Sequence, residues 1–189
     1  LLLCDGMGTG EEARHEAVST STLLKELIES GLDAHDAMQT INGLYILRDG
    51  GGFAAIDLLQ VSLVTAEGFL HKWGAAPSFL KFGRIVQQVG SALPPPGLGV
   101  GKSCGPECIR VSLERGEALI LTSDGVDAAI AGRYLQSCGE LSVRELAAGV
   151  VSSSEEAAPD DRTAAVLRLK RTEPQRRGKR KVLAHIRLL

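Results

Sequence analysis

The chain has 189 residues, a formal net charge of −2 and 44% hydrophobic residues, which suffices for one substantial core and favours a single domain. No apolar run approaches the roughly 20 residues that a membrane-spanning helix needs, and no basic segment typical of a signal peptide precedes the first apolar residues. The four cysteines form no CxxC pair, which favours free thiols in the cytoplasm over a zinc site.

The charge is unevenly distributed along the chain. Residues 168–189 hold nine of the 21 Lys and Arg residues and one of the 23 acids, which leaves residues 1–167 with a net charge of −10. Such an acidic body suits cations better than nucleic acid, so no DNA partner is expected. We therefore predict a domain over residues 1–170 and a basic tail over residues 171–189, whose TEPQRRGKRK stretch is typical of a solvated linker. RNA or an anionic surface is an alternative partner of this tail, although no aromatic residues lie among its charges.

Two helices are predicted in the first third of the chain, after the apolar run LLLC, which is typical of the end of a buried strand. Thr9 and Glu12 have the spacing of a capping box, which places the first helix start near Gly10, and Gly31 is suited to end this helix. Asp33 is suited to cap a second helix that ends before the triple glycine. The inward face of this second helix is expected to comprise Ala37, Met38, Ile41, Leu44 and Tyr45.

Most of the rest of the chain is predicted as antiparallel strands. Residues 53–74 should form a hairpin about the turn AEG, FLKFG and IVQQVG two short strands, and residues 91–107 a loop rich in Pro and Gly. CIRVSL and ALILT flank the turn ERGE as a second hairpin, a capping box of Ser142 and Glu145 opens a helix, and TAAVLRLK is the last strand. Hairpins with grouped helices indicate an α+β fold of antiparallel sheets rather than a parallel βαβ sheet.

Aspartate stands where a predicted strand meets a loop at three places: Asp5 in LLLCDG, Asp124 in LILTSDGV, and Asp160 with Asp161 in APDDRT. Carboxylates at the ends of neighbouring strands would converge at one sheet edge, where like charges raise one another's pKa unless a cation neutralises them. Such oxygen ligands suit Mg²⁺ or Mn²⁺. Any one of these sites alone is more typical of a turn, so the metal-site hypothesis depends on their co-occurrence. Asp57, within AAIDLL, is instead predicted to be a buried, hydrogen-bonded structural carboxylate.

These motifs resemble those of a known family. DGMGTG, FAAIDL, KWGAAPSF, LPPPGLG, ILTSDGV and PDDRT occur in the order found in the metal-dependent protein phosphatases (PPM, type 2C). They look most like the phosphatase domain typified by sporulation stage II protein E, and the resemblance covers about residues 1–170. It implies an α-β-β-α sandwich of antiparallel sheets with two Mn²⁺ or Mg²⁺ ions at one end.

The resemblance also implies a function, that of a protein serine/threonine phosphatase. In such a protein the two ions activate a water that attacks phosphoserine on a regulatory protein, an anti-sigma factor antagonist, and a homodimer is allowed. Attachment to a membrane is implied only through a region absent from this chain. The expected location is therefore the cytoplasm, or the cytoplasmic face of a membrane if the chain is part of a longer protein.

Matched residue by residue, the resemblance implies a set of metal ligands. Asp5 takes the place of the bridging aspartate, and Gly6 offers its backbone carbonyl. Asp124 matches the next ligand. Asp160 matches the family's acid three positions before the threonine, and Asp161 lies beside it as a further candidate.

Two further expectations come from the same resemblance. The helix after DGMGTG matches one that regulates activity by moving against the metal site, with Gly8 and Gly10 present for tight approach of the backbone. In the family a pair of strands with a further acidic residue precedes DGMG, whereas this chain begins at Leu1. A fragment, or a truncated sandwich without these N-terminal strands, is therefore expected. The alternative function is a catalytically impaired phosphatase-like module that binds and regulates a partner protein.

Overall fold

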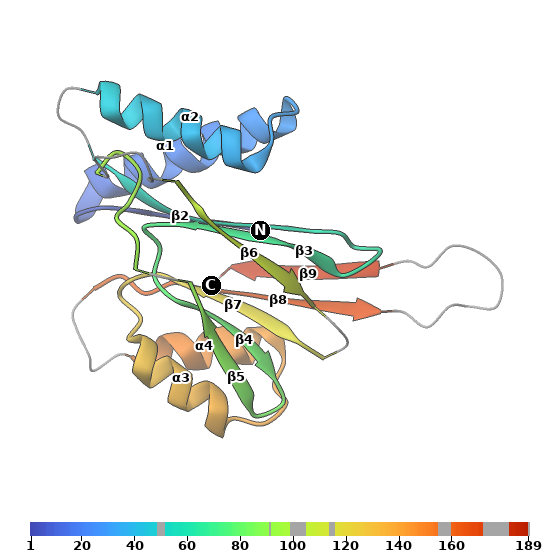
Figure 1. The fold of residues 1–189 in the computed structure, drawn as a ribbon. Coiled ribbons are helices and arrows are strands. Elements are labelled where there is room, and N and C mark those ends of the chain that lie inside the picture. Colours follow the sequence, from blue (N-terminus) through green and yellow to red (C-terminus); the bar gives the residue numbers. More distant parts are fainter. Residues whose placement is uncertain are drawn as a thin grey trace.

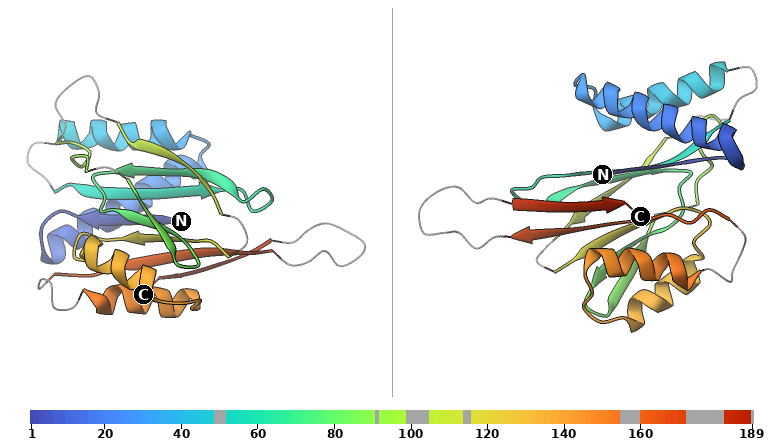
Figure 2. Two further views of the ribbon diagram at one scale, coloured as in Figure 1. Left: turned by 60° about the horizontal axis from the view of Figure 1, so that its bottom comes forward. Right: turned by 180° about the vertical axis from the view of Figure 1, so that it is seen from behind.

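The computed structural model describes residues 1–48, 52–90, 92–98, 105–113, 116–154, 160–171 and 182–188. Two antiparallel β-sheets lie face to face, and a pair of helices covers the outer face of each sheet (Figure 1). Seen from behind, the two helix pairs again lie on opposite sides of the sheets (Figure 2). The predicted α+β class and the α-β-β-α sandwich of antiparallel sheets are therefore confirmed.

A four-stranded sheet and two helices form the first half of the sandwich. The strand order is β1–β2–β3–β6, and all neighbours are antiparallel. The elements are β1 (Leu2–Gly6), α1 (Gly10–Glu29), α2 (Ala34–Leu47), β2 (Ala54–Val61), β3 (Glu67–Trp73) and β6 (Glu107–Ser112). Ile56, Leu58 and Trp73 of this sheet pack against Leu24 and Met38 of the helices. This packing holds α1 and α2 on the outer face.

A five-stranded sheet and two helices form the second half. The strand order is β5–β4–β7–β8–β9, again with antiparallel neighbours throughout. The elements are β4 (Ser78–Phe82), β5 (Ile85–Val89), β7 (Ala118–Thr122), α3 (Ala128–Ser137), α4 (Val143–Ser153), β8 (Ala164–Arg171) and β9 (Val182–Leu188). Ile120 and Val166 pack outward against Leu135 and Leu146 of α3 and α4.

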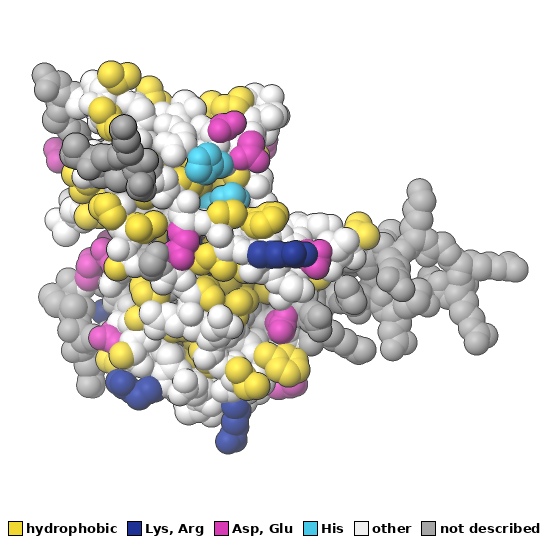
Figure 3. All heavy atoms as spheres, in the orientation of Figure 1, with side chains coloured by type: hydrophobic (Ala, Val, Ile, Leu, Met, Phe, Trp, Pro, Cys, Tyr) yellow, Lys and Arg dark blue, Asp and Glu magenta, His cyan; other side chains and the backbone are white. Residues whose placement is uncertain are grey.

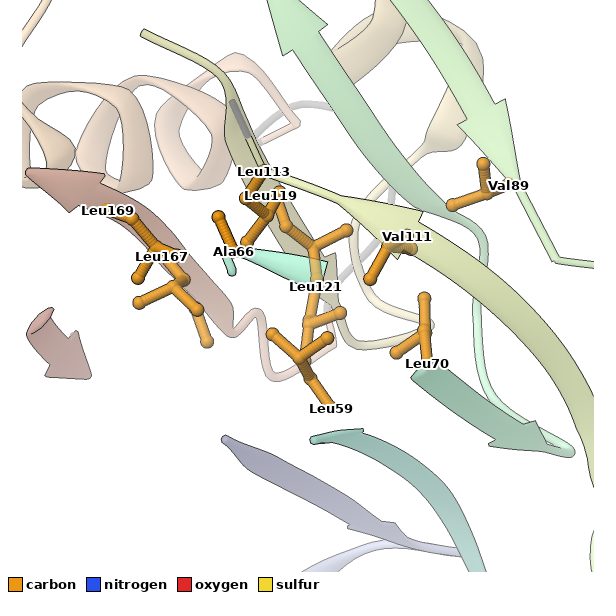
Figure 4. Packing of buried hydrophobic residues seen from close by; sticks show 11 residues of the cluster. Leu59, Ala66, Leu70, Val89, Val111, Leu113, Leu119, Leu121, Leu167 and Leu169 are labelled. Atoms are coloured by element: carbon orange, nitrogen blue, oxygen red, sulfur yellow. The ribbon is translucent and has the colours of Figure 1, made fainter. Parts of the chain in front are cut away.

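The main core lies between the two sheets. Leu59 and Leu70 of the four-stranded sheet lie in one buried cluster with Leu121 and Leu167 of the five-stranded sheet (Figure 4). Because side chains alternate along a strand, β2 turns Ile56 and Leu58 toward the helices and Leu59 and Val61 toward this core. All four of these labelled leucines are at most 2% exposed. A strand buried on both faces explains the nearly continuous apolar run that the sequence shows.

Helix α2 buries one face and exposes hydrophobic side chains on another. Four of the five predicted inward residues are buried, but Leu44 is 44% exposed, so its assignment to the inward face is wrong. Hydrophobic side chains gather over α2 at the surface (Figure 3), where Ile46 and Leu47 are also exposed. Leu44 follows Ile41 by three positions, and the drift of a helical stripe carries it to the rim of the buried face. No helix in the described part of the chain is long and apolar enough to cross a membrane.

The helix starts agree with the predictions, although one predicted cap does not form. Helix α1 begins at Gly10, but the Thr9 side chain makes no capping hydrogen bond, so the capping box with Glu12 is wrong. Thr9 has the extended backbone that is usual at an N-cap and lies between two glycines of positive φ, so only the side-chain part of the predicted cap is missing. Asp33 does cap α2 by accepting from the His35 N–H at 2.8 Å, and α4 opens with the predicted capping box.

The second predicted hairpin is wrong. Strands β6 and β7 follow one another in the sequence but lie in different sheets: β6 pairs with β3, whereas β7 pairs with β4 and β8. All five residues of β7 are buried, as in a central strand, while β6 alternates between buried and exposed positions at the edge of its sheet. The chain therefore crosses from one sheet to the other between β6 and β7.

Two other local assignments also differ from the sequence analysis. The first hairpin forms, but its turn covers residues 62–66, so Glu67 and Gly68 of the predicted turn already belong to β3. Ala66 takes the left-handed conformation that the turn needs, with a φ of 63°. Helix α3 was not predicted, although Asp127 caps it by accepting from the Ile130 N–H at 2.8 Å. That aspartate was the available signal.

The chain beyond residue 170 contributes to the five-stranded sheet. Strand β8 continues to Arg171, and residues 182–188, assigned to the basic tail from the sequence, form β9 against β8. The predicted solvated linker, TEPQRRGKRK, lies outside the described residues. The division into a domain and a separate tail stays a prediction for those linker residues.

We predict that Lys81→Met lowers the free energy of unfolding by about 1–3 kcal/mol, because buried carbonyl groups would lose a charged donor. Lys81 is 3% exposed, and its Nζ donates to the carbonyl oxygens of Leu135 at 2.7 Å and Cys138 at 3.2 Å, and to that of Gly83. It thereby satisfies the C-terminal end of α3, where a cation is favourable. Urea unfolding of both proteins measures the change, and an unchanged midpoint would contradict the prediction.

Candidate metal centre

Four of the predicted ligands lie at or beside the ends of strands, in both sheets. Asp5 and Gly6 are the last residues of β1. Asp124 lies two residues after β7, and Asp160 lies four residues before β8. Thr122 pairs with Ala164, so the end of β7 and the beginning of β8 meet at the same edge of the five-stranded sheet. The two loops are joined there, since Ser123 N–H donates to the Thr163 carbonyl at 3.0 Å and Thr163 N–H donates to Ser123 Oγ at 2.9 Å.

The charges of these aspartates act on one another. The pKa of Asp5 is raised to about 6, first by burial and then by the negative charge of Asp124, with a smaller contribution from Asp160. An N–H donated by the Asp124 backbone opposes this rise. The three carboxylates therefore lie within one another's electrostatic field, as the sequence hypothesis requires, and a cation would relieve their repulsion.

A small cavity opens beside Asp5, Gly6 and Asp124. Its volume is about 30 Å³, and its lining comprises Leu3, Asp5, Gly6, Met7, Ala55, Asp57, Gly74, Ala75, Ala76, Thr122, Ser123 and Asp124. A volume of about 10–15 Å³ accommodates one water, so the cavity has room for one or two ions or waters. Both sheets contribute to its walls, and Asp5, Asp57 and Asp124 are the aspartates among its lining residues.

Glycine is required at Gly6 by packing. A Cβ atom there would overlap the carbonyl oxygen of Ala13, so the end of β1 approaches the backbone of α1 as closely as contact allows. Gly8 and Gly10 have no atom within 4 Å of such a Cβ, so their predicted role in tight approach is wrong. They are instead needed for positive φ angles of 101° and 81° in the turn that leads into α1.

The predicted ligands do not all take part equally. Asp160 and Asp161 are both exposed and lie outside the cavity lining, and the Asp161 backbone carbonyl accepts from Ser123 Oγ at 3.3 Å. The Asp160 side chain accepts from the Asp161 N–H at 2.8 Å. Within the described residues, no group of three or more Asp, Glu, His or Cys side chains is arranged around a single ion position. The donor set of Asp5, Asp124, Asp160 and the Gly6 carbonyl nevertheless fits Mg²⁺ or Mn²⁺, because it is all oxygen and anionic.

The structure adds residues that the sequence analysis did not assign to the site. Asp57 lines the cavity and is, as predicted, buried and hydrogen-bonded, with 1% exposure. Its partner Lys72, also 1% exposed, donates from Nζ to Asp57 Oδ1 at 2.5 Å. The available signal was the hairpin register, which sets Asp57 opposite Lys72 on facing strands. Burial raises the pKa of Asp57 to about 6 although Lys72 and Ser78 lower it.

Comparison with known proteins identifies sequence relatives. The sequence profile described as "Stage II sporulation protein E (SpoIIE)" matches residues 1–170. Stage II sporulation protein E from Priestia megaterium is 32% identical over 128 residues, and the one from Bacillus subtilis (strain 168) is 34% identical over 125 residues. The matches cover 67% and 66% of this chain but only 21% and 15% of the two relatives. The chain thus spans about a fifth or less of the length of these relatives.

Solved structures extend the similarity to the fold. The PP2C phosphatase domain of SpoIIE from Bacillus subtilis, solved with a fragment of its regulatory domain, is similar with a TM-score of 0.76 and 27% identity. That match covers 92% of this chain and 54% of the solved chain. A crystal form of the same phosphatase domain without domain swapping gives a TM-score of 0.64, again at 27% identity, and covers 94% and 82% of the two chains. The resemblance to PPM phosphatases of the SpoIIE type is confirmed.

We predict that Asp124→Asn lowers the pKa of Asp5 in the metal-free protein, because the substitution removes the nearest repelling charge. The raised pKa means that the folded protein binds more protons than the unfolded chain between the ordinary value of 3.8 and about 6. The metal-free wild type should therefore lose stability as pH rises through this window, and the variant should lose less. Carbon-13 NMR titration of the Asp5 carboxyl group measures the pKa, and an unchanged value would contradict the prediction.

Proposed function

The chain belongs to the stage II sporulation protein E family, and we propose on this basis that it is a metal-dependent protein serine/threonine phosphatase. The observation that carries the proposal is the convergence of Asp5 and Asp124, from the ends of strands in two sheets, at one small cavity, with the charge of Asp160 close enough to raise the pKa of Asp5. An uncompensated carboxylate cluster beside water-sized space is the arrangement that a divalent cation stabilises.

We propose that Asp5, Asp124, Asp160 and the Gly6 carbonyl would hold two Mn²⁺ or Mg²⁺ ions. Bound there, the ions would supply Lewis acidity that lowers the pKa of a water and would neutralise phosphate oxygens. The protein's contribution is to keep Asp5 half-buried at the cavity, so that its raised pKa falls when a cation is present. Asp160 and Asp161 are both exposed and outside the lining, but the charge of Asp160 contributes to the raised pKa of Asp5, which makes Asp161 the weaker candidate ligand of the two.

We propose phosphoserine on a folded regulatory protein, of the anti-sigma factor antagonist type, as the substrate. The family membership supports this class of substrate. The cavity of about 30 Å³ has space for ions and waters but not for a whole phosphopeptide, so the substrate would present its phosphoserine from the surface. The protein that carries this phosphoserine is part of the proposal.

A second candidate function is a phosphatase-like module that regulates a partner by binding and has lost its chemistry. The observation that favours it is the absence, among the described residues, of three ligating side chains arranged around one ion position. The two candidates differ in metal binding: the enzyme requires divalent ions at the aspartates, whereas the binding module does not.

Asp124→Asn is expected to abolish Mn²⁺-dependent hydrolysis of p-nitrophenyl phosphate and of a phosphoserine protein. The loss should exceed the about 10- to 100-fold that typically follows removal of a residue that only supports a ligand. Initial rates with and without MnCl₂ measure the effect.

Asp127→Asn is the matched control for this experiment. It makes the same chemical change three residues away, at the N-cap of α3, where asparagine caps about as well as aspartate. Activity in this variant should equal that of the wild type. Wild-type turnover in Asp124→Asn would contradict the enzyme assignment, and a wild type that binds no Mn²⁺ would favour the binding module.

A further inference from the structure

We propose that Lys72 is a positioning residue for the metal centre, which ties the two sheets together at the end where the aspartates lie. This inference rests on the proposed function, because it concerns the placement of Asp5 in one sheet relative to Asp124 in the other. Lys72 is not among the residues that line the cavity. It would act through the walls of the cavity that both residues line.

The ammonium group of Lys72 uses all three of its donors within the protein. Its Nζ donates to Asp57 Oδ1 at 2.5 Å, to Ser78 Oγ at 2.7 Å and to the Ala76 carbonyl at 2.8 Å. Lys72 is 1% exposed, so no solvent competes for these bonds. The charge is therefore fixed in place by partners on three separate segments.

These partners join the two sheets. Asp57 faces Lys72 in the register of β2 and β3, in the four-stranded sheet. Ser78 is the first residue of β4, in the five-stranded sheet, and Ala76 lies in the segment 74–77 that carries the chain from one sheet to the other. One lysine thus bonds to both sheets and to the connection between them.

The connection leads directly to the candidate ligands. On the side of the five-stranded sheet, the Thr122 hydroxyl donates to the Pro77 carbonyl at 2.8 Å, and Thr122 ends β7 two residues before Asp124. On the other side, Asp57 pairs with Leu3 of β1, two residues before Asp5. A continuous path of hydrogen bonds and paired strands therefore runs from one candidate ligand through Lys72 to the other.

The packing around Lys72 leaves it little freedom to move. A Cβ atom at Gly90 would overlap the Lys72 Cε, so the backbone of that residue lies directly against the side chain. A Cβ atom at Gly74, which has a φ of 68°, would likewise overlap the backbone of Pro95. Ala75 and Ala76 form a wall of the cavity. Because Lys72 and Pro95 both restrain the segment that forms this wall, we expect loss of the lysine hydrogen bonds to change the shape of the cavity.

The test compares two buried lysines by calorimetric titration of MnCl₂ into the metal-free 189-residue chain. Lys72→Met removes the inter-sheet bonds, whereas Lys81→Met removes a buried ammonium that binds the end of α3, away from the cavity. Both variants should lower the melting temperature. Only Lys72→Met should weaken Mn²⁺ binding, by about 10- to 100-fold, as for residues that orient metal ligands.

Two further variants distinguish the positioning role of Lys72 from an effect of its charge and from a failure to fold. Asp57→Asn combined with Lys72→Met restores the charge balance but not the bonds to Ala76 and Ser78, so Mn²⁺ binding should stay weak. Ser78→Ala removes one bond from the sheet connection with little change in volume, so it should fold even if Lys72→Met does not. It should weaken Mn²⁺ binding by less than Lys72→Met does.

The outcomes distinguish this inference from the proposed function. Wild-type Mn²⁺ affinity in Lys72→Met or in Ser78→Ala, an equal loss in Lys81→Met, or full recovery in the double variant would overturn the positioning role alone. A wild type that binds no Mn²⁺ would overturn the proposed function, and this inference with it.

Discussion

The packing of one sheet on the other is the constraint on which the rest of the structure depends. Leu59 and Leu70 meet Leu121 and Leu167 across the interface and keep water from the middle of the sandwich. Polar groups of the inner faces must then lie at the ends of the strands, where they reach solvent, or be paired inside. The aspartates at the strand ends lie where solvent can reach them, whereas Asp57 is paired with Lys72 in the interior.

The elements that the sequence predicts well are those decided by neighbours in the chain. Asp33 and the Ser142–Glu145 capping box signal helices through contacts within three residues. Strand pairing is decided by residues far apart in sequence, so β6 and β7 looked like a hairpin from their spacing although each belongs to another sheet. Likewise, the apolar stretch VLAHIRL is a local signal for β9, but its place beside β8 depends on pairing that the sequence alone does not show.

The residues of the candidate site also differ in whether their role is decided by neighbours in the chain or by residues far away in sequence. Asp5, Asp124 and Asp160 could be found because each stands beside a recognisable apolar strand, and their mutual influence on pKa follows from the fold. Lys72 could not be found from its own surroundings, HKWG, because its role depends on Asp57 fifteen residues earlier and on the sheet crossover at Ser78. The exposed positions of Asp160 and Asp161 were equally hidden, because the burial of a loop residue depends on the elements that the fold places around it.

The buried ion pair also bears on which carboxylates near the cavity remain available to a cation. Asp57 and Asp5 both line it, and burial raises the pKa of each to about 6. The charge of Asp57 is matched by Lys72, whereas among the described residues neither Asp5 nor Asp124 has an ion-pair partner. Binding a cation at Asp57 would require breaking a buried pair, which is costly because it leaves an ammonium unpaired in the interior. At Asp5 and Asp124 a cation removes a repulsion instead. The lysine thus excludes Asp57 as a ligand and leaves the strand-end aspartates as the anionic group that a divalent ion would stabilise.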